Sequence, residues 1–209
     1  KDHIFTNINL KHIYQVPQHL YSQKIINVIE NDLNLKNKNE VNLSLIHNIH
    51  DVFCKNENKK NIAIIGKYTK LNDTYLSIHR ALEHSCYFMG INVNITYIDS
   101  EEFECKNNIE KIKYKLKNVD GVVIPGGFGI RGIEGMINIA SYCRKNDIPT
   151  LGICLGMQIM CIESARNTLG NKCISVEMLK NDEDRVNYNS IIIPMKELNN
   201  DMLGGTMKL

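Results

Sequence analysis

The stretch Pro149-Thr-Leu-Gly-Ile-Cys-Leu-Gly-Met-Gln158 decides the fold that we expect for this chain. Apolar residues over 148–153 predict a buried strand, and apolar residues at helical spacing from Leu155 onward predict a helix. The strand runs straight into the helix, with Cys154 at the joint and a glycine two positions to either side. This is the nucleophile-elbow pattern, G-x-S-x-G, with sulfur in place of oxygen.

The elbow pattern makes Cys154 a candidate nucleophile. A sharp turn from a strand into a helix brings backbone segments close together, so only glycine fits at positions 152 and 156. Unpaired N–H groups and the helix dipole at the start of the helix stabilise a thiolate, which is the reactive form of cysteine. The N–H of Leu155 is placed to bind a developing oxyanion. A buried cysteine with a purely structural role is the alternative at this point.

Apolar runs and helical patterns alternate along the chain after Asn61, as in βαβ units around a parallel sheet. The predicted strands cover 62–66, 93–98, 121–124 and 149–153, and the predicted helices cover 74–88, 106–117, 132–145 and 155–169. We therefore expect an α/β fold with a doubly wound parallel sheet. Ligands of such sheets gather beyond the carboxyl ends of the strands, where the loops after residues 124 and 153 are expected to lie.

The loop Pro125-Gly-Gly-Phe-Gly-Ile-Arg-Gly132 follows the third predicted strand. Its last six residues match the dinucleotide fingerprint G-x-G-x-x-G, but that fingerprint follows the first strand of its domain. Pro125 also interrupts the strand-to-turn geometry that the fingerprint uses. The fingerprint has an acidic residue about 20 positions further on. Here that residue is Asp147, which precedes the next strand and so lies at the wrong end of the sheet. Tandem glycines after a strand also let backbone N–H groups face a developing negative charge. We therefore expect half of an oxyanion hole, with Gly127 as the donor and a plain flexible turn as the alternative.

The composition is that of an ordinary globular protein, with 43% hydrophobic and 23% charged residues in a chain of 209. The 25 basic and 23 acidic residues are spread along the chain without a basic stripe, so we expect no nucleic-acid partner. No apolar run of about 18 residues occurs, which argues against a membrane span and favours a cytoplasmic protein.

The seven cysteines form no C-x-x-C pair, so the sequence predicts neither a disulfide framework nor a zinc site. A reducing compartment fits this pattern. Cys143 and Cys161 stand among apolar residues at helical spacing, and we expect both to lie in the buried core.

The first 60 residues are rich in Asn and Lys and have only scattered apolar positions. They contain one predicted helix, from about His19 to Asp32. The polar stretches 34–40 and 55–60 have the composition of linkers. We therefore expect a domain boundary near residue 60.

Several separate segments together resemble one family. Gly152-Ile-Cys-Leu-Gly-Met-Gln158 is similar to the nucleophile motif of class I (triad) glutamine amidotransferases, and Pro125-Gly-Gly-Phe-Gly129 is similar to their oxyanion loop. The segments that resemble the amidotransferases of the CTP synthase family in particular are Ile13-Tyr-Gln-Val-Pro17, Gly66-Lys-Tyr68, Asp73-x-Tyr75-x-Ser77, Ala81-Leu-Glu-His84, Ile98-Asp-Ser100, Phe128-Gly-x-Arg-Gly132-x-Glu-Gly135 and Leu203-Gly-Gly-Thr-Met-Lys-Leu209. The resemblance implies a flavodoxin-like doubly wound sheet of the class I amidotransferase type over 61–209. It implies that 1–60 is the tail of a synthetase domain and an interdomain linker.

The resemblance also implies roles for single residues. Cys154 would attack the side-chain amide of L-glutamine, and the N–H groups of Gly127 and Leu155 would hold the oxyanion. The residues that would bind glutamine are Gly127, Leu155, Gly156, Met157, Gln158 and Glu177. Glu177 would meet the α-ammonium group, although Ile174 stands where the family has an asparagine and the spacing is one residue shorter. The resemblance implies no metal ligand in this part.

In the family, the ammonia passes to a synthetase domain of the same polypeptide, which uses ATP to aminate UTP to CTP. The resemblance therefore implies that the full-length protein uses ATP and Mg²⁺, is activated by GTP and forms a tetramer. No P-loop motif occurs in these 209 residues, so we expect the ATP chemistry in sequence outside them and no cofactor within them.

The chain departs from the family in one essential feature. A cysteine amidotransferase needs a general base, which the family supplies as a His-x-Glu pair downstream of the nucleophile. All seven histidines of this chain precede Cys154. We therefore expect the domain to be incomplete at its C-terminal end and inactive as given. The alternatives are a non-catalytic amidotransferase-like module for regulation or subunit contact, and a different hydrolase of the same fold.

Overall fold

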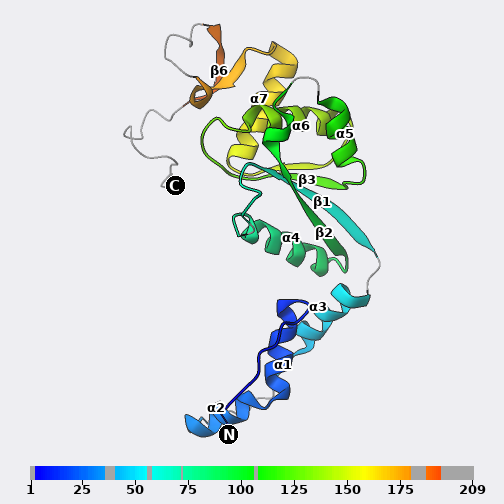
Figure 1. Ribbon diagram of the computed structural model, residues 1–209, viewed down its shortest axis with the longest axis vertical. Coiled ribbons are helices and arrows are strands. Elements are labelled where there is room, and N and C mark those ends of the chain that lie inside the picture. Colours follow the sequence, from blue (N-terminus) through cyan, green and yellow to red (C-terminus); the bar gives the residue numbers. More distant parts are fainter. Residues whose placement is uncertain are drawn as a thin grey trace. The chain divides into compact units, whose positions relative to one another are not determined.

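The computed structural model describes residues 3–35, 41–55, 58–71, 73–105, 108–179 and 187–193. The chain divides into two compact units, shown in Figure 1. The first holds the chain up to Lys59 together with Ala81–Val93, and the second holds Lys60–Arg80 and the chain from Asn94 onward.

The first unit is helical. Its elements are η1 (Ile13–Gln15), α1 (Val16–Ser22), α2 (Ile25–Asp32), α3 (Ser44–Lys55) and the second half of α4 (Leu76–Phe88). The side chain of His47 on α3 bonds the side chain of Gln18 on α1 at 2.8 Å. Tyr14 follows the start of η1, and its hydroxyl group bonds Nε2 of His84 on α4.

The single helix expected over residues 19–32 is wrong. The chain forms α1 and α2 instead, with a break at Gln23 and Lys24. Lys24 has a left-handed backbone conformation, with φ of 61°, and no helix continues through such a residue. The helix α3 was not predicted, although Leu45, Ile46, Ile49 and Val52 stand at helical spacing, so its signal was present in the sequence and was missed.

The second unit is built around a four-stranded sheet of order β2-β1-β3-β4. Its strands are β1 (Lys59–Gly66), β2 (Asn92–Asp99), β3 (Gly121–Ile124) and β4 (Thr150–Gly152). β1 and β3 run parallel with Ile64 opposite Val123, and β3 and β4 run parallel with Ile124 opposite Gly152. This order is that of the first four strands of a flavodoxin-like sheet, so the expected fold class is confirmed.

Helices α5 (Ile109–Leu116), α6 (Ile133–Lys145) and α7 (Leu155–Leu169) lie together over one face of the sheet in Figure 1. Their apolar sides and the strands form one core, which contains Phe103 of the short helix η2 (Ser100–Phe103). The predicted helices and strands of this unit occur within three residues of their expected bounds, except that residues 106 and 107 lie outside the described part.

Two ion pairs support this layer. The carboxylate of Glu163 on α7 is buried and accepts hydrogen bonds of 3.0–3.1 Å from the guanidinium of Arg144 on α6. Arg166 on α7 bonds both carboxylate oxygens of Glu134 on α6, at 2.7 and 2.9 Å. Bidentate pairs of this kind fix two helices relative to each other because the guanidinium and the carboxylate are both planar.

A second sheet follows α7 and was not predicted. Its strands β5 (Cys173–Ser175) and β6 (Asn189–Ile192) run parallel. The short helix η3 (Val176–Met178) follows β5 directly. β5 has three residues and β6 has four, and no strand was predicted after residue 153, although the short apolar run of Ile191, Ile192 and Ile193 overlaps β6.

The six cysteines whose side chains the structure describes are free thiols. Cys143 is buried as expected, and burial raises the pKa of its thiol. Cys161 is exposed, so its expected place in the core is wrong. It lies one turn after Met157, which is half exposed, on the outer side of α7.

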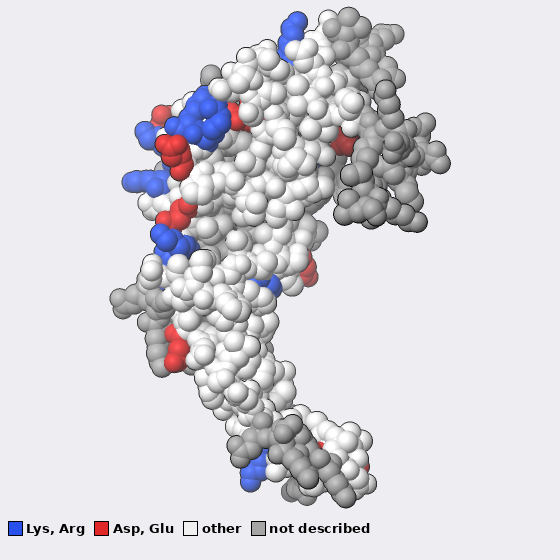
Figure 2. All heavy atoms as spheres, turned by 180° about the vertical axis from the view of Figure 1, so that it is seen from behind, with Lys and Arg blue, Asp and Glu red and all other residues white. Residues whose placement is uncertain are grey.

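On the described surface visible in Figure 2, basic and acidic side chains stand in small mixed groups rather than in a broad area of one sign. None of the described helices has the length and apolar character that a membrane span requires.

The packing of Gly156 against β3 yields a test of the fold. A Cβ atom at this position would overlap with the carbonyl group of Ile124. Gly156→Ala is expected to cost about 3 kcal/mol and to lower the midpoint of thermal unfolding by about 6–12 °C. The matched control is Gly121→Ala, whose added Cβ would lie 3.2 Å from the end of the Ile62 side chain and at the ordinary contact distance of 3.6 Å from the carbonyl oxygen of Pro149. Equal midpoints for the two variants would contradict the proposed close approach.

Candidate active site

Cys154 stands at the N-terminus of α7 in a strained backbone conformation, with φ of 53° and ψ of −107°. Residues other than glycine rarely take positive φ values, and such strain persists only where the surrounding structure enforces it. The residue is exposed, and β4 ends two positions before it. The strain and the exposure are those of a nucleophile elbow.

The two glycines of the pattern enforce this turn. A Cβ atom at Gly152 would lie 2.5 Å from the carbonyl carbon and oxygen of Gly156. A Cβ atom at Gly156 would overlap with the carbonyl of Ile124 on β3. At these two glycines, β4, α7 and β3 therefore approach so closely that no side chain fits between their backbones, as the sequence predicts.

The glycine loop after β3 lies beside the elbow. The backbone N–H of Ile153 donates to the carbonyl oxygen of Ile124 at 2.9 Å, which extends the pairing of β3 and β4 to the start of both loops. A Cβ atom at Gly126 would lie 3.5 Å from Cβ of Cys154, and one at Gly127 would lie 3.3 Å from Cδ2 of Leu155. The structure thus brings the two predicted oxyanion donors to the same place as the thiol.

The remaining residues of the elbow belong to the first turn of α7. Leu155 and Gly156 are buried, Met157 is half exposed, and the N–H of Gln158 donates to the carbonyl oxygen of Cys154 at 3.2 Å. The first N–H groups of a helix have no partner within the helix. They form a favourable environment for a thiolate or an oxyanion at Cys154.

Glu177 lies in η3, where its backbone N–H donates to the side-chain oxygen of Ser175 at 3.3 Å. Its side chain is exposed. Its negative charge is close enough to Lys67, at the end of β1, to oppose the lowering of that residue's pKa. A free carboxylate is therefore present at the carboxyl end of the sheet.

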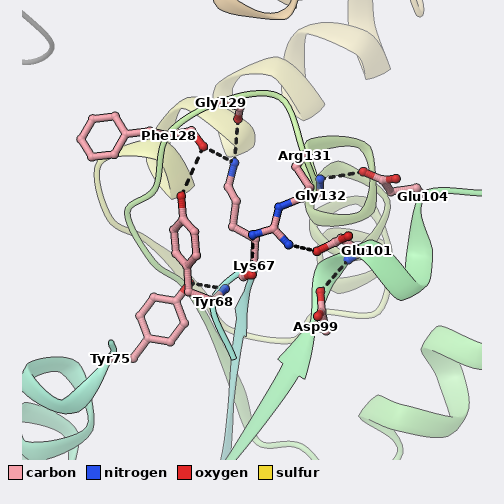
Figure 3. A network of polar contacts seen from close by, with 10 residues as sticks. All are labelled: Lys67, Tyr68, Tyr75, Asp99, Glu101, Glu104, Phe128, Gly129, Arg131 and Gly132. Carbon is pink, nitrogen blue, oxygen red and sulfur yellow. Dashed lines mark hydrogen bonds and ion pairs between the residues drawn. The ribbon is translucent and has the colours of Figure 1, made fainter. Parts of the chain in front are cut away.

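Lys67 was not among the site residues predicted from the sequence. It follows β1, is only 3% exposed, and donates to the carbonyl oxygens of Phe128 and Gly129 at 2.9 and 2.6 Å (Figure 3). Burial lowers the pKa of its ammonium group, and the neighbouring charge of Arg131 adds to this effect. A lysine directly after a buried strand was the available signal, but most lysines at strand ends reach solvent.

Five of the described histidines have partners that the structure shows. Those partners are Asp32 for His3, the carbonyl oxygen of Thr6 for His19, Gln18 for His47, Tyr97 for His79 and Tyr14 for His84. None of these five contacts involves the elbow. Within the described ranges, no group of three or more His, Cys, Asp or Glu side chains is placed to hold a metal ion.

Comparisons with known proteins extend these observations. The family model described as glutamine amidotransferase class-I matches residues 70–209. CTP synthase from Coprothermobacter proteolyticus is 37% identical over 207 residues, which are 99% of this chain and 37% of that protein. CTP synthase 2 from Bos taurus is 39% identical over 205 residues, which cover 94% of this chain and 34% of that protein. The chain thus spans little more than a third of the length of these relatives.

A solved structure agrees with the sequence matches. The glutaminase domain of Trypanosoma brucei CTPS with bound acivicin is 41% identical to this chain, with a TM-score of 0.53. The likeness covers 58% of this chain and 46% of that one. With the elbow and the glycine loop in place and the family model matched over 70–209, the chain belongs to the class-I glutamine amidotransferase family.

Proposed function

We propose that this chain is the glutamine-hydrolysing part of a CTP synthase and that it releases ammonia through a thioester on Cys154. The observation that carries this proposal is the position of the strained, exposed Cys154 beside the glycine loop at Gly126 and Gly127. The likeness to CTP synthases over nearly the whole chain supports the choice of substrate class.

In the proposed reaction, the sulfur of Cys154 attacks the side-chain amide carbon of glutamine. A C–S bond forms, and the electron pair of the C=O double bond moves to the oxygen. When the pair returns, the C–N bond breaks, and the proton of the thiol leaves with the nitrogen as ammonia. Water then hydrolyses the γ-glutamyl thioester to glutamate and restores the thiol.

The oxyanion of this reaction would be held by the N–H of Leu155, which follows Cys154 in the chain, and by the N–H of Gly127, whose neighbour Gly126 lies beside Cys154. We assign the binding of glutamine to these residues together with Gly156, Met157, Gln158 and Glu177. The exposed carboxylate of Glu177 would pair with the α-ammonium group of the substrate.

The general base would come from a histidine paired with a glutamate, downstream of Leu209 in the full polypeptide. The proposal rests on the chemistry of cysteine nucleophiles, which need a base within hydrogen-bond reach. Reading the sequence that follows Leu209 tests it directly. A full-length sequence without such a pair would remove the catalytic assignment.

For the whole protein, we propose an amidotransferase domain over 61–209 and, over 1–60, the end of a synthetase domain with a linker. The synthetase domain would aminate UTP with ATP and Mg²⁺, with GTP as activator. The cytoplasm would be its compartment and a tetramer its assembly. The relatives named CTP synthase support the synthetase part of this proposal, whereas the cofactors, the activator, the compartment and the tetramer rest on the family resemblance.

The central test replaces the nucleophile in the full-length protein. Cys154→Ala is expected to lower glutamine-dependent CTP formation by at least about 1,000-fold, because no thioester forms without the sulfur. CTP formation from added ammonium salt is expected to continue at the normal rate. The matched control is Cys161→Ala, which removes another exposed thiol of the same helix.

Labelling with acivicin, a glutamine analogue, separates an enzyme from a non-catalytic module. The wild-type protein is expected to gain the mass of the label on Cys154, and glutamine is expected to slow the reaction. An unlabelled protein, or glutamine-dependent CTP formation that survives Cys154→Ala, would refute the proposal.

A second test addresses substrate binding. Glu177→Gln removes the charge but keeps the shape, so the KM for glutamine is expected to rise about 10-fold or more with kcat nearly unchanged. The control is Glu110→Gln on α5, where an exposed carboxylate is neutralised at a distance from the elbow along the chain. Equal KM values in the two variants would remove Glu177 from the glutamine site.

A further inference from the structure

The loop after β3 needs an outside restraint to act as an oxyanion hole. Three of the four residues over 126–129 are glycines, and Gly129 has a positive φ of 74°. Glycine populates many backbone conformations, and its peptide groups can therefore turn either their N–H or their carbonyl oxygen toward a ligand. A carbonyl oxygen facing a developing oxyanion would repel it.

The side chain of Lys67 supplies such a restraint. Its ammonium group donates to the carbonyl oxygens of Phe128 and Gly129 at 2.9 and 2.6 Å (Figure 3). The hydroxyl group of Tyr68 donates to the oxygen of Phe128 as well, at 3.5 Å. Two successive carbonyl groups of the loop are thus turned toward the end of β1.

The loop in turn holds the backbone of Lys67. The guanidinium of Arg131 donates to the carbonyl oxygen of Lys67 at 3.0 Å, and it also pairs with the carboxylate of Glu101. The N–H of Gly132 donates to Glu104 at 2.6 Å. The side chain of Lys67 thus bonds the backbone in the middle of the loop, and the side chain of Arg131, near the end of the loop, bonds the backbone of Lys67. Together these bonds form a closed ring of contacts.

The same lysine packs directly against the predicted oxyanion donor. A Cβ atom at Gly127 would lie 3.1 Å from Cε of Lys67 and 3.3 Å from Cδ2 of Leu155. Gly127 therefore lies between the stem of Lys67 and the residue that follows the nucleophile. Because Lys67 contacts Gly127 directly, a shift of the Lys67 side chain would move Gly127, the predicted oxyanion donor, with no other residue between them.

The environment of Lys67 fits a structural cation that is held in place. A buried ammonium group is costly unless hydrogen bonds and opposite charges compensate it. The two carbonyl groups provide the hydrogen bonds, and the charges of Glu177, Glu101 and Glu104 oppose the effect of burial and of Arg131. The ammonium group of Lys67 therefore bonds the loop rather than solvent.

We propose that Lys67 is a positioning residue for glutamine hydrolysis: it fixes the Phe128 and Gly129 carbonyl groups and thereby aims the N–H of Gly127 at the oxyanion. This inference rests on the proposed function of Cys154. It assigns to Lys67 no contact with the substrate.

The test compares Lys67→Met with Lys70→Met in the full-length protein. Lys70 is exposed and lies three residues further along, so it controls for the loss of one positive charge. Lys67→Met is expected to lower kcat for glutamine hydrolysis on the order of 100-fold, because one oxyanion donor loses its orientation. The KM for glutamine is expected to stay the same, and Lys70→Met is expected to match the wild type.

A second readout separates positioning from general stability. Iodoacetamide alkylates Cys154 at a saturated carbon, and no oxyanion forms in that reaction. Its rate, measured by the mass of the peptide that contains Cys154, is expected to be unchanged in Lys67→Met. If the Met variant does not fold, Lys67→Gln enters the same assays with the same expectations.

Two results would overturn the inference. One is a kcat of the Lys67 variant equal to that of the Lys70 variant. The other is a parallel loss of hydrolysis and alkylation, which would mean that the lysine only supports the fold. Either result leaves the role of Cys154 intact, because that role is tested separately, by Cys154→Ala and by labelling with acivicin.

Discussion

The active site depends on one close approach, that of the first turn of α7 to the carbonyl group of Ile124 on β3. Gly156 permits it, because any side chain there would occupy the space of that carbonyl. With the helix so near the sheet, the chain must turn sharply after β4, and Cys154 takes the strained conformation that results. The same approach sets the start of α7 beside the loop after β3. A single backbone contact therefore places the thiol, the helix N-terminus and the glycine loop together.

The sequence predicted this region well because the constraint is local. Gly152, Cys154 and Gly156 lie within five consecutive positions, and the alternation of apolar strands and helical patterns identified the sheet around them. The bounds of α7 agree with the structure at both ends. Where the pattern was weak, the prediction failed. The break at Lys24 is one residue inside an otherwise helical pattern, and the strands β5 and β6 have only three and four residues. The helix α3 is the exception, because its amphipathic spacing was present in the sequence and was missed.

The candidate site divides in the same way. Cys154, Gly127 and Leu155 were found from spacing, and the structure brings them together. Glu177 came from a family resemblance alone, and its position shows only that its charge lies near Lys67. Lys67 stood in the family-like segment Gly66-Lys-Tyr68, but no role was predicted for it, because its partners are carbonyl oxygens more than 60 positions away along the chain. Backbone acceptors leave no mark in a sequence, so contacts of this kind emerge only from a folded structure.

The ring between Lys67 and Arg131 has a consequence for how the sequence can change. Each of the two side chains bonds the backbone of the other's segment, and the backbone remains whatever the side chains are. Loss of either side chain therefore leaves the hydrogen bonds of the other in place, but it removes one of the two sets of bonds that hold the loop. Because each contact is made to backbone and survives the loss of the other residue, substitutions at these two positions should arise independently among diverging relatives rather than in pairs.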